Sequence, residues 1–440
     1  MISIFAVLLS LIIIGNFSSV ANGSHELGMK FGDTVPILND TSLTVKEVAR
    51  GLHLATRMAF IDTNDILVLD KMNGTVKLVH NGSLIDQPLL DVNVANAYER
   101  GMVGIAISNA SGVTNVFLYF TEAKSKDGGI ALGNRLYRYE LLNDKLVKPK
   151  MLLDLPATPG PFHNGGAVSI GPDGNVYLSI GDVYGTCETS IHNNSACHKT
   201  QTQAQNFHSK VKPDGRAGIL RVTQDGKVVN GKGILGDSYP LNLYYGYGIR
   251  NSFGMDFDPV TRNLWDSENG PSFGDEINLV KPGFNGGWVK VQGVWKPNGI
   301  YPRSVLLKPD ERDLEDFGGR GKYSAPEFTW RYTVGPTAVA FVNSDKMGKR
   351  YENDLLVGDV NNGNLYHFDL NETRTGLILK GKLADKVADN KLENNDIILG
   401  HNFGEITDIK VGPDGYVYLL VYSQQYGKIL KIVPRQIANE

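Results

Sequence analysis

Short β-rich runs separated by turn residues recur along the whole chain, and few segments show a helical period. The first run of each pair is Ile66–Leu69, Val116–Phe120, Val176–Ile180, Asn263–Trp265, Leu355–Val357 or Val417–Val421. The second run is Val76–Val79, Arg135–Tyr139, Gly218–Val222, Glu276–Val280, Asn364–Phe368 or Lys428–Val433. Several of these runs alternate apolar and polar residues, which is typical of half-buried antiparallel strands.

The turns between the runs are rich in Gly, Pro, Asp and Asn, as in Gly171–Gly174 and Gly412–Gly415. Six copies of a two-strand pattern, spaced roughly 45 to 95 residues apart, indicate radial repetition. The sequence therefore predicts an all-β fold, a six-bladed β-propeller with long inter-strand insertions.

A chain of this length gives each blade roughly 70 residues, well above the 40–45 of minimal propeller repeats. The excess falls into insertions, of which the longest are residues 183–212 and 289–327. Insertions on one face of a repeat fold commonly build its binding site. We expect Leu43–Leu52 to supply the strand that closes the last blade.

Composition excludes two classes of protein. With 44 Lys+Arg against 47 Asp+Glu, the net charge is −3, which argues against a nucleic-acid binder that works through a broad basic face. A hydrophobic fraction of 41% and a charged fraction of 21% exclude disorder as the main state.

The N-terminus predicts export. Residues 1–14 are almost wholly apolar, too few to span a bilayer, and Ser19–Ala21 offers a small-residue cleavage site. We therefore predict a signal peptide over residues 1–21, a single propeller domain over 22–440, and a secreted or extracytoplasmic mature chain without a membrane span. In the predicted mature chain, seven Asn-x-Ser/Thr sequons agree with a glycosylated exported protein, at Asn22, Asn39, Asn73, Asn81, Asn109, Asn193 and Asn371.

The chain has two cysteines, Cys187 and Cys197, in one polar stretch of the first insertion. Outside a reducing cytosol we expect a local disulfide between them. A metal site that also uses His192 and His198 is the alternative.

Two glycine-rich segments carry groups suited to catalysis. His163 stands before Gly165-Gly166 at a strand entry, and Asp182 stands at the far end of the same hairpin, where it could orient the imidazole. Arg250 lies in a second glycine-rich segment and could stabilise a negative charge. The simpler alternatives are a surface-loop histidine and a solvated arginine.

A third segment suits a cation. Gly270-Pro271 and, after a short gap, Asp275-Glu276 combine carboxylates with backbone carbonyls, and calcium takes six to eight oxygen ligands. A plain acidic turn is the alternative interpretation.

The ordered set of these motifs resembles the soluble glucose/sorbosone dehydrogenase family. The motifs are Glu99–Gly104, His163-x-Gly165-Gly166, Gly171–Gly174, Gly181-Asp182, Gly248–Asn251 and Gly270-Pro271 with Asp275–Asn278. The resemblance runs from about Val45 to Val433. It implies a six-bladed propeller that oxidises aldoses to lactones with pyrroloquinoline quinone (PQQ) and calcium, and passes electrons to an external quinone, copper protein or cytochrome.

The resemblance also implies roles for individual residues. His163 would be the general base, Asp182 would raise its basicity, and Arg250 would stabilise charge on the quinone. Glu99, Asn251 and Thr333 would contact the cofactor. The carbonyls of Gly270 and Pro271 would bind calcium, with Asp275 and Glu276 beside them.

The chain departs from the family where PQQ carboxylates are held. Glu405, Thr407 and Asn361 stand where the family has basic residues. Arg331, two residues before Thr333, is expected to replace part of that charge. Since a charge-assisted hydrogen bond contributes about 1.5–3 kcal/mol, these changes weaken the expected binding of PQQ. Two alternatives stay open: a propeller that binds carbohydrate or a partner without turnover, and an esterase- or lactonase-like propeller that uses calcium and His163.

Overall fold

The computed structural model describes residues 35–110, 112–183, 204–206, 212–296, 310–423 and 426–435. The predicted signal peptide, both cysteines and His192 and His198 lie outside these residues. Among the described residues, no helix is both long enough and apolar enough to cross a membrane.

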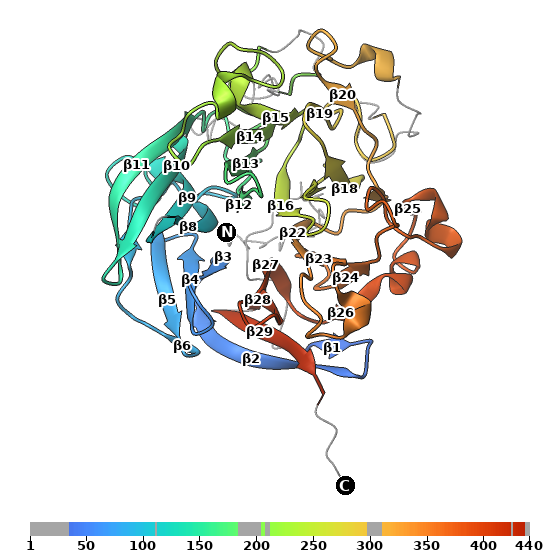
Figure 1. The fold of residues 1–440 in the computed structure, drawn as a ribbon. Helices are drawn as coiled ribbons and strands as arrows, with labels where there is room; N and C mark the ends of the chain where they lie inside the picture. The colour runs from blue at the N-terminus through green and yellow to red at the C-terminus, as the bar shows by residue number, and fades with distance from the viewer. Residues whose placement is uncertain are drawn as a thin grey trace, which may run out of the picture.

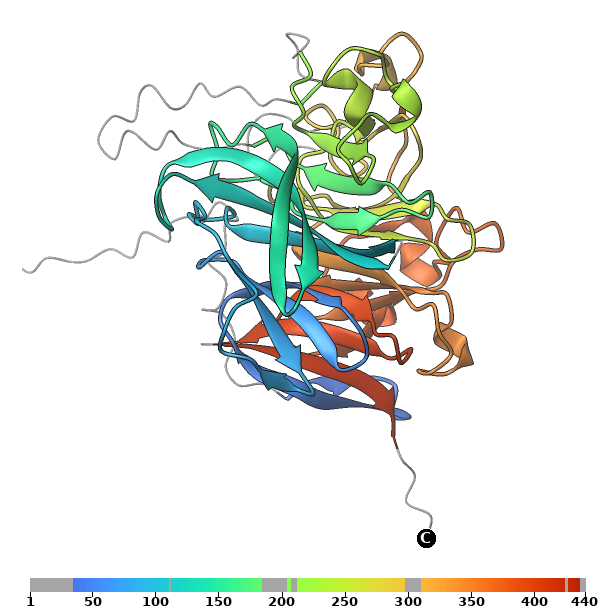
Figure 2. The same ribbon diagram turned by 60° about the vertical axis from the view of Figure 1, so that its left-hand side comes forward.

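The described strands form six sheets around a common centre, which Figure 1 shows along the central axis and Figure 2 shows obliquely. We number the sheets 1 to 6 by the chain order of their innermost strands. Those strands are β3 (Ala55–Phe60), β8 (Met102–Ala110), β12 (Val168–Ile170), β16 (Ser252–Phe257), β22 (Pro336–Phe341) and β27 (Glu405–Val411). Each packs against the next, and β27 packs against β3, so the inner strands make a closed ring. The all-β class and the propeller arrangement are confirmed.

The strands that follow are the two-strand repeats predicted from the sequence. The first runs become β4 (Asp65–Asp70), β9 (Val113–Ala123), β13 (Val176–Ile180), β17 (Leu264–Glu268), β23 (Leu355–Asp359) and β28 (Val417–Ser423). The second runs become β5 (Thr75–His80), β10 (Ala131–Leu142), β14 (Gly218–Val222), β18 (Asp275–Val280), β24 (Leu365–Phe368) and β29 (Tyr426–Pro434). In every sheet the two strands pair antiparallel, which confirms the predicted repeat.

Outer strands and short helices complete the sheets. The outer strands are β1 (Ile37–Leu38), β2 (Leu43–Leu52), β6 (Ser83–Leu84), β7 (Leu90–Asp91), β11 (Lys145–Leu155), β15 (Tyr244–Tyr247), β19 (Phe284–Asn285), β20 (Lys322–Tyr323), β21 (Phe328–Trp330), β25 (Val387–Ala388) and β26 (Ile398–His401). The described helices are single 3-10 turns, η2 (Val229–Gly231), η3 (Leu241–Leu243), η4 (Glu311–Asp313), η5 (Lys349–Tyr351), η6 (Gly381–Asp385) and η7 (Glu393–Asp396).

The first long strand closes the ring. β2 pairs antiparallel with β29, so residues 43–52 complete the sheet whose other three strands come from the end of the chain. This pairing is the closure predicted for Leu43–Leu52. It joins the two ends of the propeller through backbone hydrogen bonds.

Six apolar cores fill the spaces between neighbouring sheets. Strand β4 shows why its sequence is continuously apolar: Leu67 and Leu69 pack toward sheet 2, whereas Ile66 and Val68 pack toward sheet 6. A strand that is buried on both faces has a continuous apolar sequence. Apolar and polar residues alternate only in strands with one solvent-exposed face. The half-buried pattern therefore fits parts of β5 and β29, but not the middle strands.

Candidate active site

Most of the predicted site residues line one cavity of about 290 Å³ at one end of the ring. Glu99, His163 and Arg250 lie in loops that lead into the inner strands, and Asp182 and Gly270 follow β13 and β17, the strands that pair with inner strands β12 and β16. Because adjacent strands are antiparallel, the start of an inner strand and the end of its neighbour lie at the same edge of a sheet. Loops and strand ends of all six sheets thus line the cavity.

His163 lines the cavity with its imidazole held from behind by Asp182. The distance between His163 Nδ1 and Asp182 Oδ1 is 2.6 Å, and both side chains are buried. The second oxygen of Asp182 accepts a hydrogen bond from Trp288 Nε1 at 2.8 Å. A carboxylate bonded to Nδ1 fixes the orientation of the ring and stabilises its protonated form.

Glycines bring the His163 loop close to its neighbours. A Cβ at Gly165 would lie 2.3 Å from the carbonyl oxygen of Ser179, and one at Gly181 would lie 2.3 Å from that of Arg250. Any larger residue at either position would push the loops apart. The glycine-rich sequence therefore allows His163, Asp182 and Arg250 to share one wall.

Glu99 and Asn251 brace this wall. Glu99 Oε2 accepts hydrogen bonds from the His163 backbone N–H at 2.6 Å and from Asn251 Nδ2 at 3.0 Å. Asn251 Oδ1 accepts in turn from the Gly165 N–H. Both residues line the cavity. Their side-chain hydrogen bonds therefore hold the His163 loop in place at the surface that a ligand would contact.

Arg250 lies at the cavity wall with its guanidinium over the ring of Trp288, 5.6 Å from the ring centre. Its Nη1 donates to the carbonyl of Asn269 at 2.7 Å, and its buried Nε finds no hydrogen-bond partner among the described residues. A buried donor without a partner is costly, so it is a natural contact for an anionic or carbonyl oxygen of a ligand.

The segment around Gly270-Pro271 fits a hard cation. Both residues line the cavity, and beside them Asn269 Oδ1 and Ser272 Oγ are buried without a hydrogen-bond partner in the described part of the chain. Unpartnered oxygens in one short turn are the donor set that calcium prefers. Asp275 stabilises this turn, because its carboxylate accepts from the N–H groups of Gly270, Val334 and Gly335.

Three of the residues predicted at the site do not line the cavity: Asp182, which lies behind His163, and Glu276 and Arg331. Glu276 follows Asp275 on β18 and points to the opposite face of the strand, where it accepts from Gln292, Gly293 and Asn278. Arg331 is half-exposed and pairs with Asp389 beyond the outer strand β25, at 3.1 Å. The expectation that Arg331 replaces lost charge in the cavity is therefore wrong.

Burial raises the pKa of Asp275 to about 6 and that of Glu276 to about 8.

The cavity contains cations that the sequence analysis missed. Lys71, in the turn after β4, is buried and lines the cavity. Arg57, on β3, also lines it, and its guanidinium lies 3.3 Å from Asp408 and donates to backbone carbonyls of β16, β22 and β27. Asp408 balances much of the charge of Arg57. The signal for Arg57 was a single charged residue inside the apolar run 55–60.

The positions at which the chain departs from the family differ in their surroundings. Asn361 and Glu405 line the cavity, as Thr333 does, and Glu405 is only 2% exposed. Thr407 lines it too, but its hydroxyl lies within hydrogen-bond distance of the carbonyls of Ala55 and Leu420. The residues present fit a polyanionic, planar cofactor through Lys71, Arg57, Arg250, Thr333 and Asn361, with Glu405 as the unfavourable neighbour.

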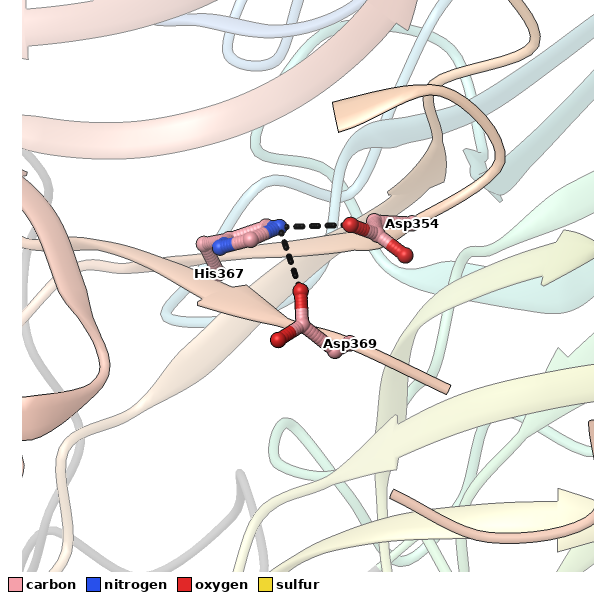
Figure 3. A group of neighbouring side chains, drawn as sticks. All are labelled: Asp354, His367 and Asp369. Atoms are coloured by element: carbon pink, nitrogen blue, oxygen red, sulfur yellow. Dashed lines mark hydrogen bonds and ion pairs between the residues drawn. The ribbon is translucent and has the colours of Figure 1, made fainter. Parts of the chain in front are cut away.

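A second cluster of ionisable groups lies away from this cavity (Figure 3). His367 Nε2 is 2.9 Å from Asp354 Oδ2 and 3.6 Å from Asp369 Oδ1. Burial and the nearby Asp354 carboxylate raise the pKa of Asp369, and the charge of His367 opposes that rise. His367 thus contacts two aspartates at a place separate from the cavity.

Comparisons with known proteins place this geometry among characterised folds. Residues 52–431 match the family model described as glucose/sorbosone dehydrogenase. The chain is 25% identical over 386 residues to an aldose sugar dehydrogenase of Escherichia coli K12, covering 86% of this chain and 89% of that protein. It is 30% identical over 270 residues to quinoprotein glucose dehydrogenase B of Acinetobacter calcoaceticus, covering 59% and 52% respectively.

Solved structures share the fold. The PQQ-bound aldose sugar dehydrogenase of Streptomyces coelicolor superimposes with a TM-score of 0.62 at 21% identity, covering 90% of this chain and all of that one.

Proposed function

Because the chain belongs to the glucose/sorbosone dehydrogenase family, an oxidoreductase family, we propose that it oxidises aldose sugars to lactones with PQQ and calcium in the central cavity. The observation that carries the proposal is the His163–Asp182 pair, 2.6 Å apart, on the same wall as Arg250. We also propose that each of the six sheets is one blade of a six-bladed propeller.

The chain's own residues would divide the work as follows. His163 Nε2 would accept the proton of the anomeric hydroxyl, since Nδ1 is bonded to Asp182. Asp182, itself held by Trp288, would stabilise the imidazolium that results. When bound, the quinone supplies the acceptor for the hydride that leaves C1, so the sugar loses two electrons and becomes the lactone.

The cavity residues would hold the cofactor and the ion. Lys71, Thr333 and Asn361 would face the acidic groups of PQQ, and Arg250 would lie against its quinone oxygens. Gly270 and Pro271 would offer carbonyl oxygens to calcium. We propose that an external electron acceptor reoxidises the enzyme, and that the chain is exported, with the Cys187–Cys197 disulfide and glycosylated sequons.

The test is reconstitution. PQQ and Ca²⁺ are added to purified apoprotein, and reduction of an electron-accepting dye is followed with a panel of aldoses. Dye reduction that requires sugar, PQQ and His163 supports the proposal. Absence of PQQ binding in a direct titration contradicts it.

One observation favours a second candidate. Glu405 brings a buried carboxylate to the wall of a cavity that would receive an anionic cofactor, and like charges repel strongly where water is scarce. A propeller that binds carbohydrate without turnover would carry no such conflict. Sugar binding without PQQ binding would identify that function.

A further inference from the structure

An exposed aromatic residue lies at the wall of the cavity, close in sequence to the groups that brace His163. Tyr98 lines the cavity and is 56% exposed, although large apolar side chains beside a cavity usually pack against protein. Exposed aromatic surface at the edge of a polar cavity is typical of a ligand contact. The proposed reaction does not use Tyr98.

Tyr98 is held firmly in this position. Its φ is +55°, a left-handed backbone conformation that is uncommon for a bulky residue and that clusters at functional sites. The next residue is Glu99, whose carboxylate accepts from the His163 N–H at 2.6 Å. The turn that carries Tyr98 is therefore fixed to the histidine loop.

A second aromatic ring supports the first. The rings of Tyr98 and Phe162 have centres 4.8 Å apart and planes inclined by 54°. Phe162 immediately precedes His163 and is half-buried. The aromatic pair thus comes from the residues directly before Glu99 and directly before His163, so its distance from the imidazole is set by the same hydrogen bond.

We propose that Tyr98, supported by Phe162, is the platform on which the C–H face of a pyranose ring lies while its anomeric hydroxyl faces His163. The inference rests on the proposed function and names its substrate class. An aromatic face attracts C–H groups and does not replace the hydration of hydroxyls. The platform therefore favours a pyranose with equatorial hydroxyls, such as the gluco form, over its 2- and 4-epimers. The axial hydroxyls of those epimers lie on one face of the sugar and would project toward the ring of Tyr98 when that face lies on it.

Tyr332 provides a matched control. It is 57% exposed, almost as much as Tyr98, but it lines a separate recess beside Trp330 and Asn362. A general effect of removing a surface tyrosine would appear in both variants. An effect through the platform would appear only at position 98.

The test uses methyl β-D-glucopyranoside, which has no free anomeric hydroxyl and cannot be oxidised to the lactone. Its binding to the full-length protein is measured by calorimetry for the wild type, Tyr98→Ala, Tyr98→Phe and Tyr332→Ala, and PQQ affinity is titrated for each. We expect Tyr98→Ala to raise the Kd for the glycoside about tenfold or more. Tyr98→Phe and Tyr332→Ala should stay close to the wild type, and PQQ affinity should be unchanged in all four proteins.

Two results would overturn the platform: equal glycoside affinity in wild type and Tyr98→Ala, or equal weakening in Tyr332→Ala. The 2- and 4-epimers of the glycoside test the selectivity, and a wild type that binds them as tightly as the gluco form contradicts it. Tyr98-dependent glycoside binding in a protein that binds no PQQ would support the platform and reject the dehydrogenase. Dye reduction by the wild type together with unchanged glycoside binding in Tyr98→Ala would support the dehydrogenase and reject the platform.

Discussion

His163 Nδ1 lies 2.6 Å from Asp182 Oδ1 although 19 residues separate the two in sequence. The pair is buried, and Trp288 donates to the second oxygen of the same carboxylate. An imidazole in this setting has one orientation, which is the condition for a general base to act on a bound substrate.

Replacing His163 by alanine should abolish sugar oxidation and leave folding and PQQ binding largely intact. The base acts on the proton of the substrate, and such catalysis typically contributes 10²–10⁴-fold. Dye reduction at saturating PQQ measures the loss, and circular dichroism checks the fold. Normal turnover by this variant would show that the assignment of the base is wrong.

Trp288→Phe should lower kcat about tenfold, because it removes one hydrogen bond to a buried carboxylate, a contribution of roughly 1.5–3 kcal/mol. Asp182→Asn should cost more than Trp288→Phe and less than His163→Ala. The three kcat values, measured at saturating sugar, give the order. If Trp288→Phe equals the wild type, Asp182 does not depend on the indole.

Lys71→Met should weaken PQQ binding about tenfold or more, because it removes a buried cation from the cavity wall. The measurement is a fluorescence titration of apoprotein with PQQ in the presence of Ca²⁺. Lys227→Met, at an exposed lysine, serves as the control. Equal Kd values for the Lys71 variant and the wild type would mean that other groups hold the acids.

Glu405→Gln should tighten PQQ binding by about tenfold, because it removes a buried like charge while keeping the side chain's size. Thr407 is a poorer target for substitution. Its hydroxyl contacts the carbonyls of Ala55 and Leu420, and Arg57 donates a hydrogen bond to the backbone carbonyl of Thr407. The same titration reports the change. A weaker-binding Glu405→Gln variant would show that the carboxylate supports the cavity.

Asp266→Asn should stabilise the protein increasingly as the pH rises from about 4 to about 7. Burial raises the pKa of Asp266 to about 7, and the neighbouring Ser252 and Asn278 side chains only partly oppose that rise. Between the unfolded pKa of about 4 and the folded value the native state holds one extra proton, so wild-type stability falls as the pH rises.

Above pH 7 the difference should level off at on the order of 4 kcal/mol. Melting temperatures of wild type and variant at pH 4, 5.5 and 7.5, with a chelator in every sample, measure the effect. A gap that does not change with pH would mean that Asp266 is ionised throughout.

The sequence by itself determined the repeat. The six paired runs were readable because both strands of each pair carry β-branched, aromatic and aliphatic residues between turns that Gly, Pro, Asp and Asn favour for local backbone reasons. The residues His163, Asp182 and Arg250 were also readable, because the glycines beside them mark loops that approach one another closely.

Only the tertiary structure decided which groups share the cavity. Consecutive residues on a strand face opposite ways, so Asp275 faces the Gly270 turn while Glu276 faces Gln292. Arg331 was expected inside and lies at the outer edge of sheet 4, paired with Asp389. Arg57 and Lys71 come from sheet 1, Tyr98 from the loop before β8 and Trp288 from the loop after β19, and none belongs to a motif. Their meeting depends on how six sheets close into a ring, which is a property of long-range packing that no local pattern records.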